Sequence, residues 1–232
     1  MSEDGDGPKY TFQTENGETK SMSRGYTGKA VASYPNGDLY DGDFIDGIRE
    51  GRGEYRYASN GDKYDGEWRV NCKHGIGKMS YNGKGEYHGY WENGRRHGEG
   101  TFTYPNGDVY SGWWRFGEKE GTGTYLFKET GMRLQGQWEK SEVTEGKWVY
   151  PNGIYFHGKF ENNKPKGEGI WYFKNGNTLK GCYEQKPKEL DEDEEEPEED
   201  DENAAKKPKF DLVWKSETNI AEAAHLVNSV EQ

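Results

Sequence analysis

The sequence predicts an all-β fold, an elongated and twisted single antiparallel sheet of stacked β-hairpins. Three observations predict it: aromatic-x-Gly-x-aromatic segments recur at a nearly constant step, residues alternate within each repeat, and turn residues such as Asn-Gly separate the alternating runs. The steps are 24, 23, 23, 24, 22 and 23 residues, measured between Gly42, Gly66, Gly89, Gly112, Gly136, Gly158 and Gly181. A period this regular is typical of a repeat architecture.

Each repeat reads as two short strands. In the repeat at residues 87–109, Tyr87, Gly89 and Trp91 share one face of the first strand, because side chains alternate along a strand. The second strand carries Gly98, Gly100, Phe102 and Tyr104 on one face. Glycine beside large rings suggests that each ring lies over the bare backbone of the neighbouring strand. Six complete repeats align between residues 40 and 178, and at about 4.8 Å per strand they would span on the order of 60 Å.

The chain divides by composition into four segments. Residues 1–25 form a partly disordered N-terminal segment in which Tyr10–Phe12 would be a degenerate capping strand, and residues 26–184 form the repeat array with half repeats at each end. Residues 185–209 are an acidic, charged linker that we expect to be disordered. Residues 210–232 are a tail with a short amphipathic helix at about 220–229.

The repeat that begins at Leu134 departs from the pattern. Leu134 replaces the first aromatic residue, as Leu179 does later in the chain, and Thr144 replaces a glycine. This repeat is also one residue short. We therefore expect an irregular twist near residues 140–146.

Charge and cysteine content exclude several classes of function. The formal charge is 31 minus 43, or -12, and residues 189–202 alone hold twelve acidic and no basic side chains, so the remainder is neutral. A neutral array does not favour nucleic acid or an anionic membrane as partner. Cys72 and Cys182 are the only cysteines, which indicates a reducing compartment. No apolar run is long enough for a signal or membrane-spanning segment, so we expect a cytoplasmic location.

No catalytic, cofactor or metal site emerges from the motifs. The Gly-x-Gly segments lie inside predicted strands and recur, whereas a dinucleotide-binding loop needs a strand, the glycines and then a helix. The histidines of neighbouring repeats would lie about 9–10 Å apart, too far to share a metal ion. The acidic cluster at Asp41, Asp43, Asp65 and Glu67 is better explained as a solvated face than as a carboxylate pair or cation site.

The face opposite the rings changes along the array. It is charged in the early repeats, but the later repeats carry apolar residues there: Trp113, Leu126, Val149, Ile170 and Tyr172. Chance scatter, the segment Leu212–Val230 folding back, or another chain covering this face would each explain the change. The tail carries its own candidate anchors, Phe210, Leu212, Trp214, Ile220 and Val227, and its short helix needs a surface on this sheet or on a partner.

The pattern Y-x-G-x-W followed by G-x-G-x-x-x-Y-x-N-G resembles the MORN repeat family over residues 26–184. Six or more repeats, an acidic tract and Trp214-Lys215 before Ile220 are most similar to the radial spoke head MORN proteins of cilia and flagella. That resemblance implies a non-enzymatic scaffold of the ciliary axoneme and cytoskeleton that binds other radial spoke head proteins, with a homodimer left open. We expect no cofactor, because no cofactor fingerprint appears, and no nucleic acid, because the array has no basic surplus.

The same family leaves two alternatives. MORN repeats also occur in junctional membrane proteins and lipid kinases, so a membrane-apposed lipid-binding module is the second hypothesis, disfavoured by the neutral array and acidic tail. Some arrays precede a kinase or methyltransferase domain, but the stretch after Tyr183 is short and holds no cofactor fingerprint. We therefore expect no enzymatic activity.

Overall fold

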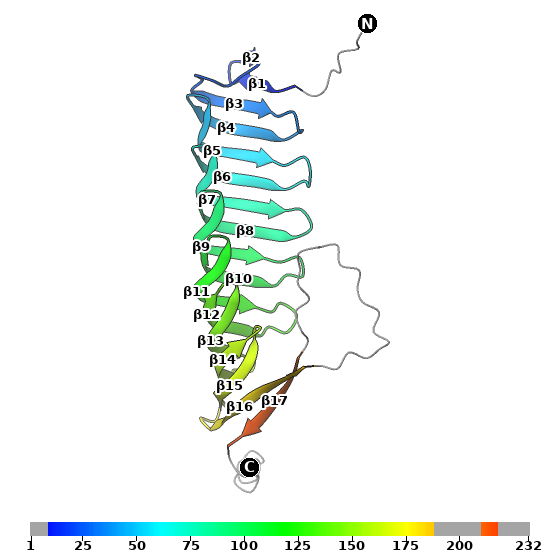
Figure 1. Cartoon of the computed structure of the whole chain (residues 1–232), viewed down its shortest axis with the longest axis vertical. Coiled ribbons are helices and arrows are strands. Elements are labelled where there is room, and N and C mark those ends of the chain that lie inside the picture. Colours follow the sequence, from blue (N-terminus) through cyan, green and yellow to red (C-terminus); the bar gives the residue numbers. More distant parts are fainter. Residues whose placement is uncertain (1–8, 188–209, 218–232) are drawn as a thin grey trace, which may run out of the picture. The chain divides into compact units, whose positions relative to one another are not determined.

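The structure is a computed structural model, and it describes residues 9–187 and 210–217. All regular elements in these ranges are β-strands joined by turns (Figure 1). The predicted all-β fold of stacked antiparallel hairpins is therefore confirmed. The chain divides into two compact units, Met1–Glu129 and Thr130–Gln232, and each is a sheet in which strands consecutive in the chain mostly pair with each other.

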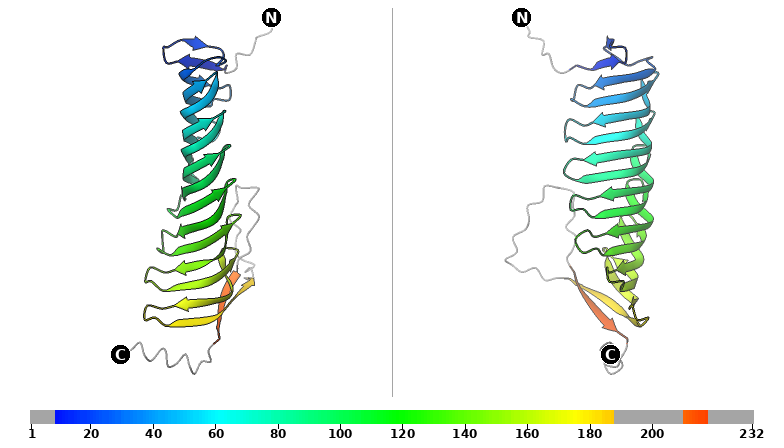
Figure 2. Two further views of the ribbon diagram at one scale, coloured as in Figure 1. Left: turned by 90° about the vertical axis from the view of Figure 1, so that its left-hand side faces the viewer. Right: turned by 180° about the vertical axis from the view of Figure 1, so that it is seen from behind.

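The first unit holds eleven strands (Figures 1 and 2). They are β1 (Thr11–Thr14), β2 (Thr19–Lys20), β3 (Gly28–Ser33), β4 (Leu39–Ile45), β5 (Ile48–Arg56), β6 (Lys63–Arg69), β7 (Cys72–Tyr81), β8 (Gly85–Glu92), β9 (Arg95–Thr103), β10 (Val109–Arg115) and β11 (Glu118–Leu126). The sheet begins before residue 26, because β1 pairs with both β2 and β3. Phe12 of β1 is fully buried, so this strand closes the aromatic layer as a cap.

Tight turns join the two strands of each repeat. Asp46-Gly47, Asn93-Gly94 and Phe116-Gly117 have positive φ at both residues, which is the type I′ geometry that matches the twist of paired strands. Beyond each turn the pairing shifts at a β-bulge, for example between Gly89 and Trp91. Four of the bulges of the first unit contain a glycine with positive φ: Gly51, Gly75, Gly98 and Gly121.

The bulge separates two kinds of glycine that alternation alone had placed on one face. Gly98 is the bulge residue, with φ +58°, whereas Gly100 has ordinary strand geometry. A Cβ added to Gly100 would lie 2.3 Å from the Tyr87 hydroxyl oxygen. The predicted packing of a ring over a bare backbone is confirmed for Gly100, and the prediction that Gly98 has the same role is wrong.

Neighbouring repeats are joined through their tyrosine and tryptophan rings. The Tyr87 ring contacts the Trp114 ring of the next repeat edge to face, with centroids 5.3 Å apart. The Tyr87 hydroxyl donates a 2.9 Å hydrogen bond to the carbonyl of Tyr90, and Trp114 Nε1 donates to the Gly100 carbonyl at 3.1 Å. Tyr64 and Tyr40 make the same ring contacts one and two repeats earlier. The hydroxyl of Tyr87 and the indole N–H of Trp114 are thus satisfied within the aromatic layer.

The Pro-Asn-Gly-Asp turns connect repeats through an aspartate. Asp108 is buried, and its carboxylate accepts hydrogen bonds from the Tyr125 hydroxyl and the Lys128 backbone N–H, both at 2.8 Å. Asp38 has the same arrangement with Tyr55 and Ala58. Gly37, Gly107 and Gly153 have the positive φ that these turns require.

The described part of the second unit, residues 130–187 and 210–217, holds six strands, which Figure 1 labels β12 to β17. They are β12 (Arg133–Glu139), β13 (Glu142–Val149), β14 (Tyr155–Glu161), β15 (Lys164–Tyr172), β16 (Thr178–Pro187) and β17 (Phe210–Ser216). β16 continues through residues 185–187, where the sequence predicted linker. The rest of that linker and the predicted helix at 220–229 lie outside the described residues.

The hairpin β12–β13 departs from the register of the regular repeats, next to the residues where the sequence predicted an irregular twist. Its bulge shifts the register by one residue, since Gln137 pairs with Glu145 and Trp138 with Val143, whereas regular repeats shift by two. Thr144 stands at the bulge without a positive φ. The missing residue and the missing glycine therefore have one local consequence, a shorter bulge.

Candidate interaction surfaces

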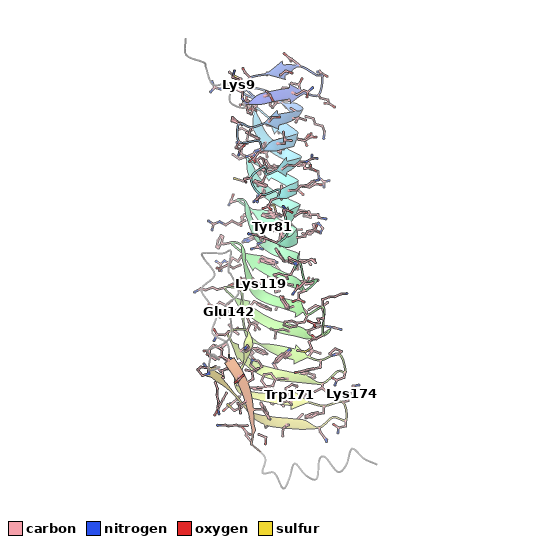
Figure 3. All side chains as sticks on the ribbon, turned by 90° about the vertical axis from the view of Figure 1, so that its right-hand side faces the viewer. Lys9, Tyr81, Lys119, Glu142, Trp171 and Lys174 are labelled. Atoms are coloured by element: carbon pink, nitrogen blue, oxygen red, sulfur yellow. The ribbon has the colours of Figure 1, made fainter. Side chains whose placement is uncertain are left out.

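Each unit is a single layer of strands, so both faces of the sheet are available for contacts. We call the face that carries Tyr87 and Trp91 the aromatic face, and the opposite one the reverse face. Side chains project from the strands in both directions, and the labelled Tyr81 and Lys119 belong to the aromatic face (Figure 3). In the described ranges no helix or second sheet packs on either face.

Three of the exposed apolar side chains on the reverse face of the first unit lie close together in register on β7, β8 and β10. Ile76 and Tyr90 are direct neighbours on β7 and β8, and Trp113 lies two strands further on β10, opposite Glu99 of β9. Their exposed fractions are 47%, 50% and 48%. We call Ile76, Tyr90 and Trp113 the apolar row. An aligned row of half-exposed large side chains is the kind of surface that marks a protein contact.

The same register positions are charged earlier in the unit. Lys29 pairs with Asp43 at 3.5 Å, and the Asp43 carboxylate also accepts a hydrogen bond from the Arg52 backbone N–H. Glu67 on β6, which pairs with Arg52, is the next residue along this register. Ile76 on the neighbouring strand β7 follows it and donates its backbone N–H to the Glu67 carboxylate. The reverse face therefore changes from paired charges to apolar side chains within one unit.

Of the residues predicted for the reverse face, Trp113 belongs to the apolar row. The others lie at other positions on that face: Leu126, Val149, Ile170 and Tyr172. Leu126 is half-buried on β11 opposite Val109. In the second unit, Val149 lies beside Tyr155, which stacks on Tyr172 with ring centroids 4.6 Å apart and an interplanar angle of 11°. Ile170 lies on the same face, opposite His157. Within that unit these residues form a second apolar cluster, with Lys147 Nζ 5.2 Å from the Tyr155 ring.

Three of the tail anchors lie on a strand, in the part of the tail that precedes the predicted helix. Phe210, Leu212 and Trp214 lie on β17, which extends the sheet edge at β16 rather than covering the reverse face. The Trp214 ring packs on the aromatic face, 4.9 Å from Tyr183 and 6.0 Å from Phe156. It lies over Gly181, a position that the shorter Leu179 leaves open. Ile220 and Val227 lie outside the described residues.

A row of basic side chains lies on the aromatic face of the first unit. Arg49, Lys73 and Arg96 start at equivalent positions and lie over the rings of Trp68, Trp91 and Trp114, at 4.6, 4.6 and 4.4 Å from the ring centroids. Lys119 continues the series, 5.0 Å from the Tyr110 ring. Burial lowers the pKa of Lys73, the Asp62 charge partly offsets this, and Arg96 lowers the pKa further. Sequence reasoning missed this row because each member is one cation among many in the sequence.

The described ranges show neither a cluster of metal ligands nor a membrane-spanning helix. Within residues 9–187 and 210–217, no three His, Cys, Asp or Glu side chains gather as ligands for a metal ion. The same ranges contain no helix with the length and hydrophobicity needed to cross a bilayer.

A family model for the MORN repeat matches five segments, residues 40–61, 64–86, 87–109, 110–130 and 156–178. These segments coincide with the hairpins of the regular aromatic layer. The chain contains MORN repeats. The segment between 130 and 156, where the MORN model finds no match, is the irregular hairpin β12–β13 and its flanking turns. The MORN repeat is a non-catalytic repeat module, and it serves in structural and interaction roles.

The comparisons also include solved structures of low sequence identity with TM-scores below 0.5. No curated protein sequence matches this chain. The TCP10 domain of Danio rerio CPAP, solved with a STIL peptide, is 10% identical with a TM-score of 0.47, over 75% of this chain and 81% of that one. The TCP domain of Drosophila melanogaster SAS-4, solved with a proline-rich motif of Ana2, is 21% identical with a TM-score of 0.43, over 66% and 83%.

The MORN frame by itself does not point to Ile76 and Tyr90. Ile76 stands between two glycines and Tyr90 directly precedes Trp91, and only the cross-strand register makes Ile76 and Tyr90 neighbours. Tyr155 was missed for the same reason, since its partner Tyr172 is on the following strand. A search of the sequence for apolar residues at paired register positions could have found both.

Proposed function

We propose that this chain is a non-enzymatic structural and protein-interaction scaffold, and within that class a subunit of the radial spoke head of ciliary or flagellar axonemes. MORN repeats support the general role. The spoke-head role is supported by the order of features in the sequence: six repeats, the acidic tract at 189–202, and Trp214-Lys215. Its proposed location is the axoneme and cytoskeleton, and its partners are other radial spoke head proteins.

The observation that carries the scaffold role is the apolar row. Ile76, Tyr90 and Trp113 are each about half exposed on a face that has no second layer in the described ranges. Large aromatic side chains at the centre of an interface often supply most of the binding energy. Leu126 in the first unit, and Val149, Ile170 and Tyr172 in the second, are further candidates for contacts on the reverse face.

Co-sedimentation with axonemes tests this proposal. The full chain is expressed with a tag in ciliated cells, and detergent-extracted axonemes are separated from the soluble fraction. We expect the wild-type chain in the axonemal pellet and cross-links from the reverse face to spoke-head proteins. The double variant Tyr90→Ser and Trp113→Ser should shift to the soluble fraction, because each lost aromatic anchor weakens an interface by about tenfold or more.

A matched control removes exposed apolar area elsewhere. Ile45 and Ile48 are 55% and 36% exposed beside a tight turn and outside the apolar row, so Ile45→Ser with Ile48→Ser should leave the distribution unchanged. Wild-type chain found wholly in the soluble fraction would contradict the spoke-head role. Salt-sensitive flotation of the chain with phosphoinositide vesicles would instead favour the membrane-apposed lipid-binding module.

A further inference from the structure

The basic row on the aromatic face has a regular geometry. Arg49, Lys73 and Arg96, which we call the cation row, each begin the second strand of a repeat. Neighbouring members lie two strand spacings apart, which corresponds to about 10 Å at the usual spacing between strands. Each half-buried side chain lies over a tryptophan ring, with tyrosines such as Tyr57 and Tyr34 within 6 Å. The charges are therefore held at fixed intervals on an aromatic base.

The hairpins do not require a cation at these positions. The equivalent residues in the second unit are Val143 and Pro165, which pair with Trp138 and Phe160 in the same way that Lys73 pairs with Trp68. Both are buried. Covering the rings is thus achieved equally well by an apolar side chain, and without the free-energy cost of partly desolvating a charge. The cation row needs another explanation.

The cation row also lacks acidic partners of its own. Among the described residues, Arg49, Lys73 and Arg96 take part in no salt bridge. The side-chain hydrogen bonds of Arg49 and Arg96 go to neutral groups, Asn71 and the Gly117 carbonyl. Asp62, whose charge acts on Lys73, accepts a hydrogen bond from the Asn82 backbone N–H, and Asp38 accepts one from the Ala58 backbone N–H.

We propose that the aromatic face of the first unit binds an extended acidic peptide segment of another protein, laid across the strands so that a carboxylate at every third residue reaches the cation row. In the polyproline II conformation an extended chain has three residues per turn and rises about 3.1 Å per residue, so every third side chain points to the same side at intervals of about 9 Å, close to the interval of the row. Half-buried Tyr57, Tyr81 and Tyr104 flank the row and can pack against the residues between the carboxylates. This surface is separate from the apolar row, so its test does not depend on the spoke-head role.

Binding of a designed peptide to the full chain tests the inference. The probe is a fluorescent peptide of about ten residues, long enough to span three row members, with Glu at every third position. Its controls carry Gln at those positions, or the same number of Glu residues in one block. Anisotropy at low and at physiological salt measures Kd. We expect the spaced Glu peptide to bind most tightly and to weaken as salt rises.

Two neighbouring arginines supply the matched variants. Arg96→Met keeps an unbranched stem over Trp114 and removes the charge, and it should raise Kd about tenfold, the loss expected for one charge-assisted contact. Arg95 is exposed and points to the opposite side of β9, so Arg95→Met changes the net charge equally and should change Kd less than about twofold. Lys73→Met should act like Arg96→Met. Thermal melts verify that each variant is folded.

The acidic tract of the chain itself is a potential competitor. The titration is therefore repeated with full-length chain in which the acidic residues of 189–202 are replaced by Gln or Asn. Tighter peptide binding to this variant supports the inference, because it shows that an acidic segment occupies the same charges. Absence of binding to both proteins at low salt, equal binding of the Gln peptide, or equal effects of Arg95→Met and Arg96→Met would overturn it.

Discussion

Glycine has two separate roles in this chain at the level of single residues. At Gly167 a φ of +77° is required by the bulge, and nothing lies within 4 Å of an added Cβ. At Gly169, two residues later, an added Cβ would lie 2.3 Å from two atoms of the Phe156 ring. That ring is fully buried and surrounded by Phe160, Trp171, Tyr183 and Trp214. One glycine provides backbone freedom and the other provides space.

The two roles predict opposite responses to substitution. Gly169→Ala should lower the free energy of unfolding by about 1–3 kcal/mol, because the enclosed Phe156 ring cannot move away from the new methyl group. Gly167→Asn should cost less than about 1 kcal/mol, since Asn tolerates positive φ and meets open space there. Urea denaturation of both variants measures the difference. A larger loss for Gly167→Asn would contradict this assignment of roles.

The tight turn is the element that sets each repeat's register. Asn93-Gly94 and Asn162-Asn163 have residues suited to positive φ, but the turn between β6 and β7 is Val70-Asn71. Val70 has a φ of +46° and is 64% exposed. A β-branched residue is strained in this conformation and here gains little burial in return.

Replacing Val70 should therefore stabilise the hairpin β6–β7. We expect Val70→Asn to raise the free energy of unfolding by about 0.5–1 kcal/mol, because Asn relieves the backbone strain and loses no packing. The reciprocal variant Asn93→Val should lower it by a similar amount. Differential scanning calorimetry on both variants provides the measurement, and a destabilised Val70→Asn would show that its exposed side chain makes an unrecognised contact.

At the scale of the whole molecule, the two units differ in their buried acids. Burial would raise the pKa of Asp108, but hydrogen bonds from the Lys128 N–H, Tyr125 and Asn106 outweigh it and lower the pKa below the usual value. The pKa of Asp38 is lowered in the same way. In the second unit the equivalent turn positions are Ile154 and Asn177. Sensitivity to acid through this turn is thus a property of the first unit.

This difference predicts how stability depends on pH. A carboxyl whose pKa is lower in the folded state stabilises the fold above its unfolded pKa, near 3.8, and that contribution is lost as pH falls through the folded pKa. Asp108→Asn should cost about 1–2 kcal/mol at pH 7, and its deficit relative to wild type should shrink towards pH 3. Urea denaturation at several pH values measures this.

The control for the acid experiment is an aspartate outside the turns. Asp41 is exposed on the reverse face, and Asp41→Asn should change stability by less than about 0.5 kcal/mol at either pH. A deficit of Asp108→Asn that stays constant from pH 7 to pH 3 would show that the carboxylate charge does not contribute.

The amino-acid sequence by itself determined the repeat, the hairpins and the aromatic face, because the period of two and the 23-residue step follow from the residue types alone. It also located the repeat that departs from the pattern, the one that contains Leu134 and Thr144. Only the tertiary structure decided that Gly98 is the positive-φ residue of the bulge, whereas Gly100 leaves the space that the Tyr87 ring occupies. It also decided that Ile76 adjoins Tyr90, and that Trp214 lies over Gly181. These facts depend on cross-strand register, which pairs residues far apart in the chain and which each bulge shifts.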